Sequence, residues 1–408
     1  MTEAQASGRT TIEDLREAAS RLDAHDPLAE ARSRFVLPEG EIYLDGNSLG
    51  ACPVSVGARV EDVLTRQWAQ RLIRSWDEGW WEAPQRIGDR IAGLVGAAPG
   101  QVVVGDSTSV NIFKLTIAGA RMRPGRTRLV VDATTFPTNG YVIESGARLL
   151  GLDVTRADPQ HLADALGEDV ALVMMNHVDY RTGELWDMSG MTQQIHACGA
   201  VALWDVCHSV GIYPLQFDEL GLELAVGCTY KYLNGGPGAP AFMYVRADLQ
   251  PAFDQPLTGW HGHAEPFGMQ PDYQPAEGIV RGRVGTPPLI SMFALDAALD
   301  AYNGISMIDA RAKTESLTTL YIDSLDALVP AGVIRIVTPR DPGRRAGQVS
   351  VAHPRARDLV KELASIGVIT DFREPNIVRH GFAPLYVSHS DVVEAAQAFA
   401  ALLPYPPD

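Results

Sequence analysis

The sequence predicts an α/β fold, with a large domain built on a mostly parallel sheet and a smaller α+β domain at the C-terminal end. Short Val-rich segments without polar alternation recur through the middle of the chain, as expected for strands of a sheet covered on both faces. Helical patterns separate them, and such alternation is typical of parallel or mixed sheets. The 408 residues, 46% of them hydrophobic, suffice for one large core or two unequal ones.

Each expected element of the large domain rests on a local pattern. A first helix is expected over residues 57–74, where Val60, Leu64, Trp68 and Leu72 fall on one face. Apolar strands are expected over residues 101–104, 128–132, 170–175, 201–205, 225–229 and 241–245. Helices are expected between them, over residues 109–120, 140–149 and 191–198.

The C-terminal part has a different pattern. We expect helices over 289–302 and 309–328, and a long helix near 289–328 that the two domains share. Strands over 334–337 and 348–351 and a helix over 359–366 follow. Asp391, with Glu394 three residues later, is expected to cap the final helix. The chain is therefore divided into an N-terminal arm and helix packing on the small domain (1–60), a large α/β domain (61–300) and a small α+β domain (301–408).

The composition excludes several classes of protein. With a net charge of −16, the surface repels phosphate backbones and anionic membranes, so neither nucleic acid nor a membrane is expected as a partner. The four cysteines form no CxxC pair, which favours reduced thiols in a cytoplasmic enzyme. We expect no secretory signal and no membrane span, because the first residues are polar and no apolar run is long enough.

Lys231 is one of four lysines, and it stands between an apolar segment and the glycine-rich turn 234–238. A lysine that forms an imine needs a lowered pKa, which burial supplies. Glycines let a bulky group come close to the backbone. Taken alone, this pattern fits an exposed lysine at a strand end better than it fits an imine former.

Two further segments change that balance. Asp205 ends an apolar strand 26 residues before Lys231, so both side chains are expected at the sheet edge where α/β proteins bind ligands. An acid placed there pairs with the pyridinium nitrogen of pyridoxal phosphate (PLP). Thr108 and Ser109 open a helix, where free N–H groups suit a phosphate. Alone, Asp205 and Ser109 are ordinary helix caps, but together the three segments indicate a PLP site.

The sequence resembles the kynureninase family, which consists of fold-type I PLP enzymes of the class V aminotransferase group. The resemblance runs from about residue 43 to about residue 386. It implies a large domain with a central, mostly parallel sheet of the seven-stranded type between helices, plus a smaller C-terminal α+β domain. The stretches that carry it are YLDGNSLG (43–50), FPTN (136–139), WDVCHS (204–209), CTYKYLNGGPG (228–238), GWHGH (259–263), GTPP (285–288) and REPNIVRHGFAPLY (373–386).

The resemblance implies a role for each matching position. Lys231 matches the Schiff-base lysine, and Asp205 matches the partner of the pyridine nitrogen. Tyr230 matches a tyrosine that reaches the phosphate and assists proton transfer, and Phe136 matches a ring that stacks on the cofactor. The implied catalytic residues are Lys231, Tyr230 and Asp205, and the further cofactor contacts are Thr108, Ser109, Phe136, Pro137, Thr138, Asn139, Asn176 and His208.

Other matching positions concern the substrate and a second subunit. Trp260 and Thr286 match residues that reach the phosphate from the neighbouring subunit, which implies a homodimer with shared active sites. Arg379 matches the arginine that binds the substrate α-carboxylate, a bidentate task that guanidinium performs well. His261 and Trp80 are expected on the substrate-ring side. For Trp80 and its tryptophan neighbours, core or dimer packing is an equally good interpretation.

The implied activity is hydrolysis of L-kynurenine, or of a ring-substituted form such as 3-hydroxykynurenine, to an anthranilate and L-alanine. Lys231 is expected to take the substrate α-proton and to return it. The resemblance leaves open whether the pathway is tryptophan catabolism, with its link to NAD biosynthesis, or a specialised biosynthesis.

Two departures from the family pattern concern the substrate pocket. The family usually has Phe at position 261 and Asp at position 139, where this chain has His261 and Asn139. A more polar ring side is expected, and the preferred ring substituent stays open. We expect no metal, because His261 and His263 lack a thiol or carboxylate partner in the sequence pattern.

Other functions fit less well. An aminotransferase of the same class would use the same lysine, acid and phosphate site, and only the resemblance at residues 260–263 and at Thr286 favours kynureninase over it. A cysteine desulfurase needs a nucleophilic cysteine late in the chain, and none occurs after Cys228. A PLP-binding regulator would be expected to have lost Lys231, Asp205 or Arg379. A dinucleotide-binding oxidoreductase would show a GxGxxG motif in a βαβ setting, which is not seen.

Overall fold

A seven-stranded sheet forms the centre of the computed structural model, which describes residues 10–403. The strand order is β4-β10-β9-β8-β7-β5-β6; strands β5 to β9 run parallel, and β10 is antiparallel to β9 and β4. The predicted mostly parallel sheet is confirmed. The strands are β4 (Val102–Val104), β5 (Arg128–Asp132), β6 (Asp153–Ala157), β7 (Val170–Asn176), β8 (Val201–Asp205), β9 (Leu224–Gly227) and β10 (Phe242–Val245).

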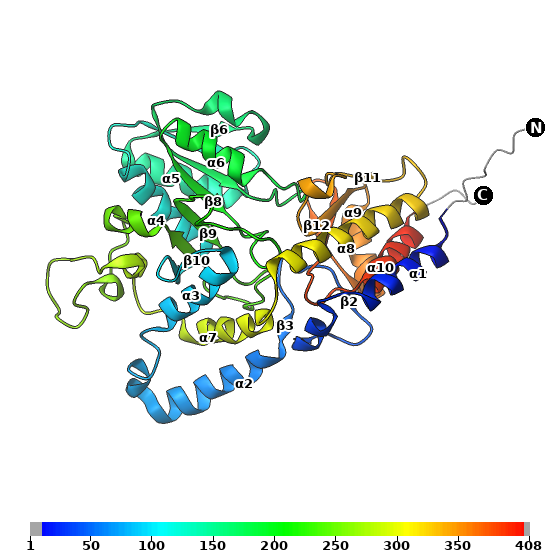
Figure 1. The fold of residues 1–408 in the computed structure, drawn as a ribbon, viewed down its shortest axis with the longest axis horizontal. Coiled ribbons are helices and arrows are strands. Elements are labelled where there is room, and N and C mark those ends of the chain that lie inside the picture. Colours follow the sequence, from blue (N-terminus) through cyan, green and yellow to red (C-terminus); the bar gives the residue numbers. More distant parts are fainter. Residues whose placement is uncertain (1–9, 404–408) are drawn as a thin grey trace, which may run out of the picture.

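Helices cover both faces of this sheet, which explains why its strands lack polar alternation. Alternate residues of β5 enter different cores, Val130 on one face and Leu129 and Val131 on the other. Helices α4 (Thr108–Arg121) and α5 (Pro137–Leu150) cover the Leu129 face. Helices α3 (Ala83–Val95), α6 (Met188–Ala197) and α7 (Leu289–Ala298) cover the other (Figure 1).

A second, four-stranded antiparallel sheet of order β11-β12-β15-β14 forms the centre of the smaller unit. Its strands are β11 (Arg335–Ile336), β12 (Gln348–Ala352), β14 (Asp371–Arg373) and β15 (Ile377–Gly381). Helices α8 (Met307–Leu328), α9 (Ala356–Ser365) and α10 (His389–Leu402) accompany it. The N-terminal helix α1 (Ile12–Ala24) packs against α10 and α8, and Figure 1 shows these blue and red helices side by side.

Short elements complete the N-terminal part and the connections. Strand β2 (Ile42–Tyr43) pairs in parallel with β13 (Val368–Ile369), and β1 (Phe35–Val36) pairs with β3 (Cys52–Pro53). The 3₁₀ helices are η1 (Ala29–Arg34), η3 (Leu72–Trp76), η4 (Pro159–Ala165), η5 (Ala247–Ala252), η6 (Trp260–Gly262), η7 (Gly278–Gly282), η8 (Leu299–Tyr302) and η9 (Pro342–Arg344). Within residues 10–403, no helix combines the length and the apolar character needed to cross a bilayer.

Several element boundaries differ from expectation. The single long helix predicted near 289–328 is wrong: α7 and α8 are separated by a turn at Gly304, whose φ is +74°, and Ser306 caps α8 anew. The early helix starts at Val54 as α2 (Val54–Asp62) and continues as a π-helix, η2 (Val63–Arg71). It stops at Leu72, which has a φ of +55°.

Two other predictions need correction. Ser388, not Asp391, caps α10; Asp391 is the third helical residue, and its carboxylate accepts from the Ser388 N–H, which completes a capping box. The strand predicted over 225–229 ends at Gly227, so Lys231 lies on the following loop rather than at the strand end. Strand β6 was not predicted, because it is a half-exposed edge strand with polar residues.

Candidate active site

The carboxyl ends of β7 and β8 and the loop after β9 meet at one edge of the central sheet. Asn176 and Asp205 are direct neighbours across the β7–β8 pair, and Asp205 lies opposite Val226 of β9. A cavity of about 120 Å³, here called the Lys231 cavity, opens at this edge. It is lined by Thr108, Ser109, Phe136, Thr138, Asn139, Asn176, Val178, Tyr180, Asp205, Cys207, His208, Tyr230 and Lys231.

Lys231 contacts a histidine from the neighbouring strand end. Its Nζ lies 2.8 Å from Nε2 of His208. Desolvation and the positive charge of Lys231 hold the pKa of His208 well below its ordinary value. The imidazole is therefore neutral, and its Nε2 accepts a hydrogen bond from the lysine. Burial raises the pKa of the adjacent Tyr230 hydroxyl well above its ordinary value, so that side chain stays protonated.

The N-terminal segment closes onto the Lys231 loop through Gly50. The Gly50 N–H donates to the carbonyl of Tyr230 at 2.8 Å. A Cβ atom at Gly50 would lie 2.2 Å from the carbonyl oxygen of Lys231, closer than any side chain tolerates. Only glycine fits this contact, which explains the glycine at the last position of the YLDGNSLG stretch.

Asp205 is fixed by two hydrogen bonds at the strand end. Its Oδ2 accepts from Nδ2 of Asn139 at 2.7 Å, and its Oδ1 accepts from the N–H of Cys207 at 2.8 Å. Asn176 lies behind this pair, where its Nδ2 donates to Oδ2 of Asp132 at 2.8 Å. An amide at position 139 therefore suits a neighbouring carboxylate. Its NH₂ group is a permanent donor, whereas a carboxyl group at this position could donate only when protonated.

Helix starts form the opposite side of the cavity. Thr108 and Ser109 are the first residues of α4, where backbone N–H groups have no acceptor within the helix. Ser107 caps this helix by accepting from the N–H of Val110 at 3.4 Å. Phe136 precedes α5, and Pro137 is its first residue. The Phe136 ring is 47% exposed and lies edge-to-face with Tyr180, at 5.2 Å between ring centroids.

Arg379 lies next to the cavity but does not line it. It is buried in β15, and its Nη1 donates to the carbonyl of Tyr180 at 2.6 Å, while its Nη2 donates to Oγ of Ser48 at 2.8 Å. Its Nε donates to Oδ1 of Asp371 at 2.6 Å, and its Nη2 also bonds Oδ2 of Asp371. The guanidinium is thus held beside a residue that does line the cavity, Tyr180.

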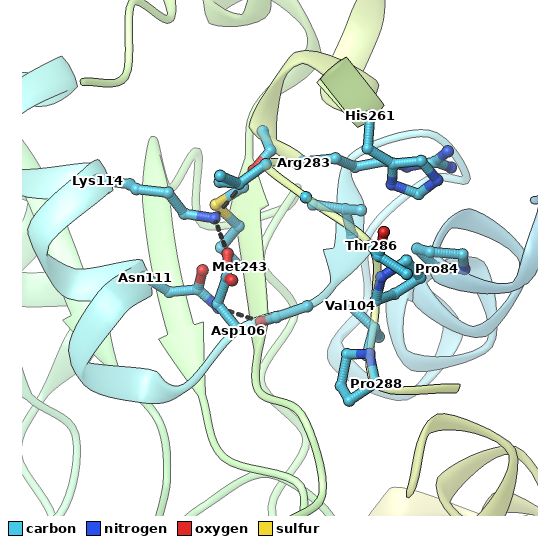
Figure 2. A pocket seen from close by; sticks show the side chains of 16 residues that line it. Pro84, Val104, Asp106, Asn111, Lys114, Met243, His261, Arg283, Thr286 and Pro288 are labelled. Carbon is cyan, nitrogen blue, oxygen red and sulfur yellow. Dashed lines mark hydrogen bonds and ion pairs between the residues drawn. The ribbon is translucent and has the colours of Figure 1, made fainter. Parts of the chain in front are cut away.

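The remaining predicted site residues lie outside the Lys231 cavity of the same chain. His261 and Thr286 line a different cavity of about 250 Å³, the Thr286 cavity. Figure 2 shows both around it, together with Lys114, whose Nζ lies 2.7 Å from Oδ2 of Asp106. Burial lowers the pKa of His261 to about 4, so its ring is neutral.

Two predicted tryptophans belong to an aromatic cluster near His261. Trp260 is 39% exposed, and its ring lies 5.5 Å from that of Trp81. Trp80 lies edge-to-face with Trp76 at 5.8 Å, and its Nε1 donates to Oε1 of Gln67 at 2.7 Å. Trp80 lines neither the Lys231 cavity nor the Thr286 cavity.

Comparison with known proteins identifies the relatives of this chain. A family model described as the kynureninase C-terminal domain matches residues 310–399. A kynureninase from Pseudomonas fluorescens is 43% identical over 390 residues, which is 94% of each chain. A kynureninase from Burkholderia pseudomallei (strain 1106a) is 43% identical over 396 residues, 95% of each chain. The chain belongs to the kynureninase family.

Solved structures show the fold of this kynureninase-family chain. A cysteine desulfurase from Thermococcus onnurineus NA1, solved without ligand, superposes with a TM-score of 0.78 at 19% identity, over 92% of this chain and 97% of that one. The cystine C–S lyase C-DES, solved with cysteine persulfide, gives 0.77 at 16% identity, over 90% and 99%. At such identities the likeness establishes the fold alone, which is PLP fold-type I as expected.

The donor set of the Lys231 cavity fits PLP. One cavity brings together an amine, a carboxylate held by two donors, and the free N–H groups at the start of α4. These groups complement an aldehyde, a pyridinium nitrogen and a phosphate, respectively. No group of three or more His, Cys, Asp or Glu side chains within the described residues is arranged to hold a metal ion.

Some cavity residues were not anticipated from the sequence. Val178 and Tyr180 line the cavity because alternate residues after Asn176 face the same side. The two-residue period of an extended segment could have predicted both of them from the sequence. Cys207 lines it as the second residue after Asp205. Asp371 holds Arg379 because β14 and β15 pair with these two residues opposite each other, a register that one sequence does not reveal.

Proposed function

We propose that this chain is a PLP-dependent hydrolase that cleaves the Cβ–Cγ bond of L-kynurenine, or of a ring-substituted kynurenine such as 3-hydroxykynurenine. With one water, the products are an anthranilate and L-alanine. The contact of 2.8 Å between Lys231 Nζ and the neutral His208 ring, beside Asp205, is the observation that carries the proposal. Membership of the kynureninase family supports the choice of substrate.

The cofactor site consists of residues from the strand ends and helix starts. PLP, when bound, supplies an electron sink for negative charge that develops on the substrate carbons. Asp205 holds a proton on the ring nitrogen, and Asn139 keeps the carboxylate in place. Thr108 and Ser109 would bind the phosphate, and Phe136 would cover the ring. Pro137, Thr138, Asn176 and His208 complete this set of contacts.

The reaction needs a base and an acid close to the substrate. Lys231 Nζ takes the α-proton and returns it, and His208 holds the amine in place through its neutral Nε2. Tyr230 stays protonated because burial raises its pKa, so its hydroxyl is available as a hydrogen-bond donor beside Lys231. Water adds to the side-chain ketone before the carbon–carbon bond breaks.

The substrate and a second subunit complete the site. Arg379 binds the α-carboxylate, and His261 faces the substrate ring, whereas the contacts of Trp80 with Trp76 and Gln67 favour its alternative role in packing. Since His261, Trp260 and Thr286 lie outside the Lys231 cavity of their own chain, we propose a homodimer in which they serve the partner's site. The four free cysteines, together with the reaction class, favour a cytoplasmic enzyme.

Anthranilate fluorescence tests the proposal directly. The holoenzyme is incubated with kynurenine, 3-hydroxykynurenine and ring-methylated kynurenines, without a keto acid. Formation of the anthranilate and of alanine in equal amounts is expected. Turnover that needs a keto-acid acceptor would instead show an aminotransferase, the alternative within this fold class. Negligible turnover of every kynurenine by the PLP-loaded enzyme would exclude the substrate class.

A further inference from the structure

Lys114 is the most deeply buried of the four lysines, and the proposed reaction does not use it. Its side chain is 1% exposed, whereas lysine is rarely buried without a charged partner. From α4, its Nζ donates to Oδ2 of Asp106 at 2.7 Å and to the Gly282 carbonyl at 2.9 Å (Figure 2). This amine therefore joins a helix, the turn before that helix and a distant segment of the chain.

Asp106 occupies a turn that sets the start of α4. Its φ is +53°, in the left-handed region that few residues other than glycine adopt. Up to this point the chain follows β10, because the Gly105 N–H donates to the Ala241 carbonyl and the Asp106 carbonyl accepts from the Ala241 N–H, both at 2.9 Å. Directly afterwards, Ser107 caps α4. The conformation of Asp106 thus decides where the N–H groups of the first helical turn point.

The helix that this turn opens also holds the turn in place. Two side chains of α4 reach back to it, since Nδ2 of Asn111 donates to the Gly105 carbonyl at 2.9 Å and Lys114 pairs with Asp106. The amine is held on its other side by the Gly282 carbonyl. Gly282 itself packs tightly on β10, where an added Cβ would collide with the Met243 side chain. Lys114 is therefore a fixed point to which the Asp106 carboxylate is tied.

The ion pair and the expected phosphate site lie on different cavities. Lys114 and Asp106 line the Thr286 cavity, whereas Thr108 and Ser109, the first residues of α4, line the Lys231 cavity. The free N–H groups of a helix start bind a phosphate best when their direction is fixed before it arrives. Lys114 can therefore act on the phosphate through the turn, without lining the cavity that receives it.

We propose that Lys114 is a positioning residue for the cofactor phosphate, because it holds Asp106 in the turn that directs the start of α4 into the Lys231 cavity. This inference rests on the proposed role of Thr108 and Ser109. Within residues 10–403, Asp106 forms an ion pair with Lys114 alone, and 31% of its side chain is already exposed. Without the amine, the carboxylate would turn to solvent and the helix start would lose its fixed direction.

Lys114→Met tests this role, since it keeps a long side chain but removes the charge. The holoenzyme is dialysed against a series of PLP concentrations, bound PLP is read from its absorbance, and the phosphate resonance is recorded by ³¹P NMR. We expect about tenfold weaker PLP binding, as for loss of a charged hydrogen bond, and a changed ³¹P resonance.

Lys313→Met is the matched control. Lys313 lies in α8, where its Nζ is 2.6 Å from Oδ2 of Asp26, and the two side chains are 5% and 3% exposed. Neither residue lines the Lys231 cavity. Loss of this equally buried ion pair should lower Tm but leave PLP binding and the ³¹P resonance like those of the parent enzyme.

A double variant separates positioning from a general loss of stability. In Lys114→Met with Asp106→Gly, the unpaired carboxylate is gone and glycine adopts a positive φ at little cost. PLP binding should return to within about threefold of the parent value, although the amine is still missing. Asp106→Asn tests the same contact from its half-exposed end if Lys114→Met does not fold, and it should also weaken PLP binding and change the ³¹P resonance.

Weaker PLP binding that is specific to the Lys114–Asp106 pair and is recovered in the double variant supports the proposal. Parent-like PLP binding by Lys114→Met, or by Asp106→Asn where that variant replaces it, overturns it. An equal loss in Lys313→Met, or no recovery in the double variant, overturns it as well. No kynurenine is present in these measurements, so failure of the proposed reaction would be seen separately in the fluorescence assay.

Discussion

Arg379 and Asp371 face each other across the β14–β15 pair and are joined by two hydrogen bonds, Nε to Oδ1 at 2.6 Å and Nη2 to Oδ2. This bidentate arrangement fixes the plane of the guanidinium. A third contact, from Nη1 to the Tyr180 carbonyl, turns the arginine towards the hairpin that lines the Lys231 cavity. The arginine is therefore oriented before any substrate carboxylate arrives.

Asp371→Asn should weaken substrate binding more than it slows the chemical step. The amide retains one acceptor but loses the charge that holds Arg379, and a charge-assisted hydrogen bond contributes about 1.5–3 kcal/mol. We expect KM for kynurenine to rise about tenfold or more while kcat changes little. Steady-state kinetics check this, with the exposed Asp358→Asn as control. An unchanged KM would show that Asp371 does not position Arg379.

Lys231→Ala should remove both the covalent attachment of PLP and the base. Loss of a positioned general base lowers turnover by about 10²–10⁴-fold. The absorbance band of the lysine-bound cofactor should disappear as well. Lys361→Ala, at an exposed position, is the control and should behave like the parent enzyme. Parent-like turnover by Lys231→Ala would refute the assigned role.

Asp45 should make the stability of the protein depend on pH. Burial, then the charge of Asp371, raises the pKa of Asp45 from 3.8 to about 7. Between these values the folded state binds the proton more tightly than the unfolded chain, so this group lowers stability progressively as pH rises towards 7. The cost is smallest below pH 4 and complete above pH 7.

Asp45→Asn removes this titration and tests it. We expect the stability of the variant relative to the parent to improve by about 2–3 kcal/mol between pH 5 and pH 8. Thermal unfolding of both proteins at each pH, with saturating PLP, measures the change. A difference in Tm that is the same at both pH values would contradict the raised pKa.

Gly50→Ala should disturb the Lys231 loop. The added Cβ would lie 2.2 Å from the Lys231 carbonyl oxygen and 2.8 Å from the Cα of Asn234, and neither backbone atom moves freely. Overpacking of this kind costs about 1–3 kcal/mol. A lower Tm and weaker PLP retention are expected. Gly57→Ala is the control, because nothing lies within 4 Å of its Cβ and it sits in α2, where alanine is favoured. Equal behaviour of the two variants would refute the close contact.

The positions of Asp205 and Thr108 could be predicted from the sequence because each depends only on the strand directly before it. Asp205 ends a wholly buried strand, and Thr108 starts a helix directly after one, so their shared sheet edge follows from topology. Asp371 was missed because its partner depends on the register of two strands. The split between α7 and α8 was missed because helical periodicity resumes after the turn at Gly304.

The pairing of β2 with β13 and the packing of α1 on α10 have a consequence for synthesis of the chain. Strand β13 and helix α10, which contact β2 and α1, are made more than 300 residues after them. Domains tend to fold as units during translation. The strands of the large sheet would therefore leave the ribosome and could pair while β2 and α1 still lacked β13 and α10. We therefore expect the segment that carries Gly50 to settle against the Lys231 loop only after residues 368–402 have emerged.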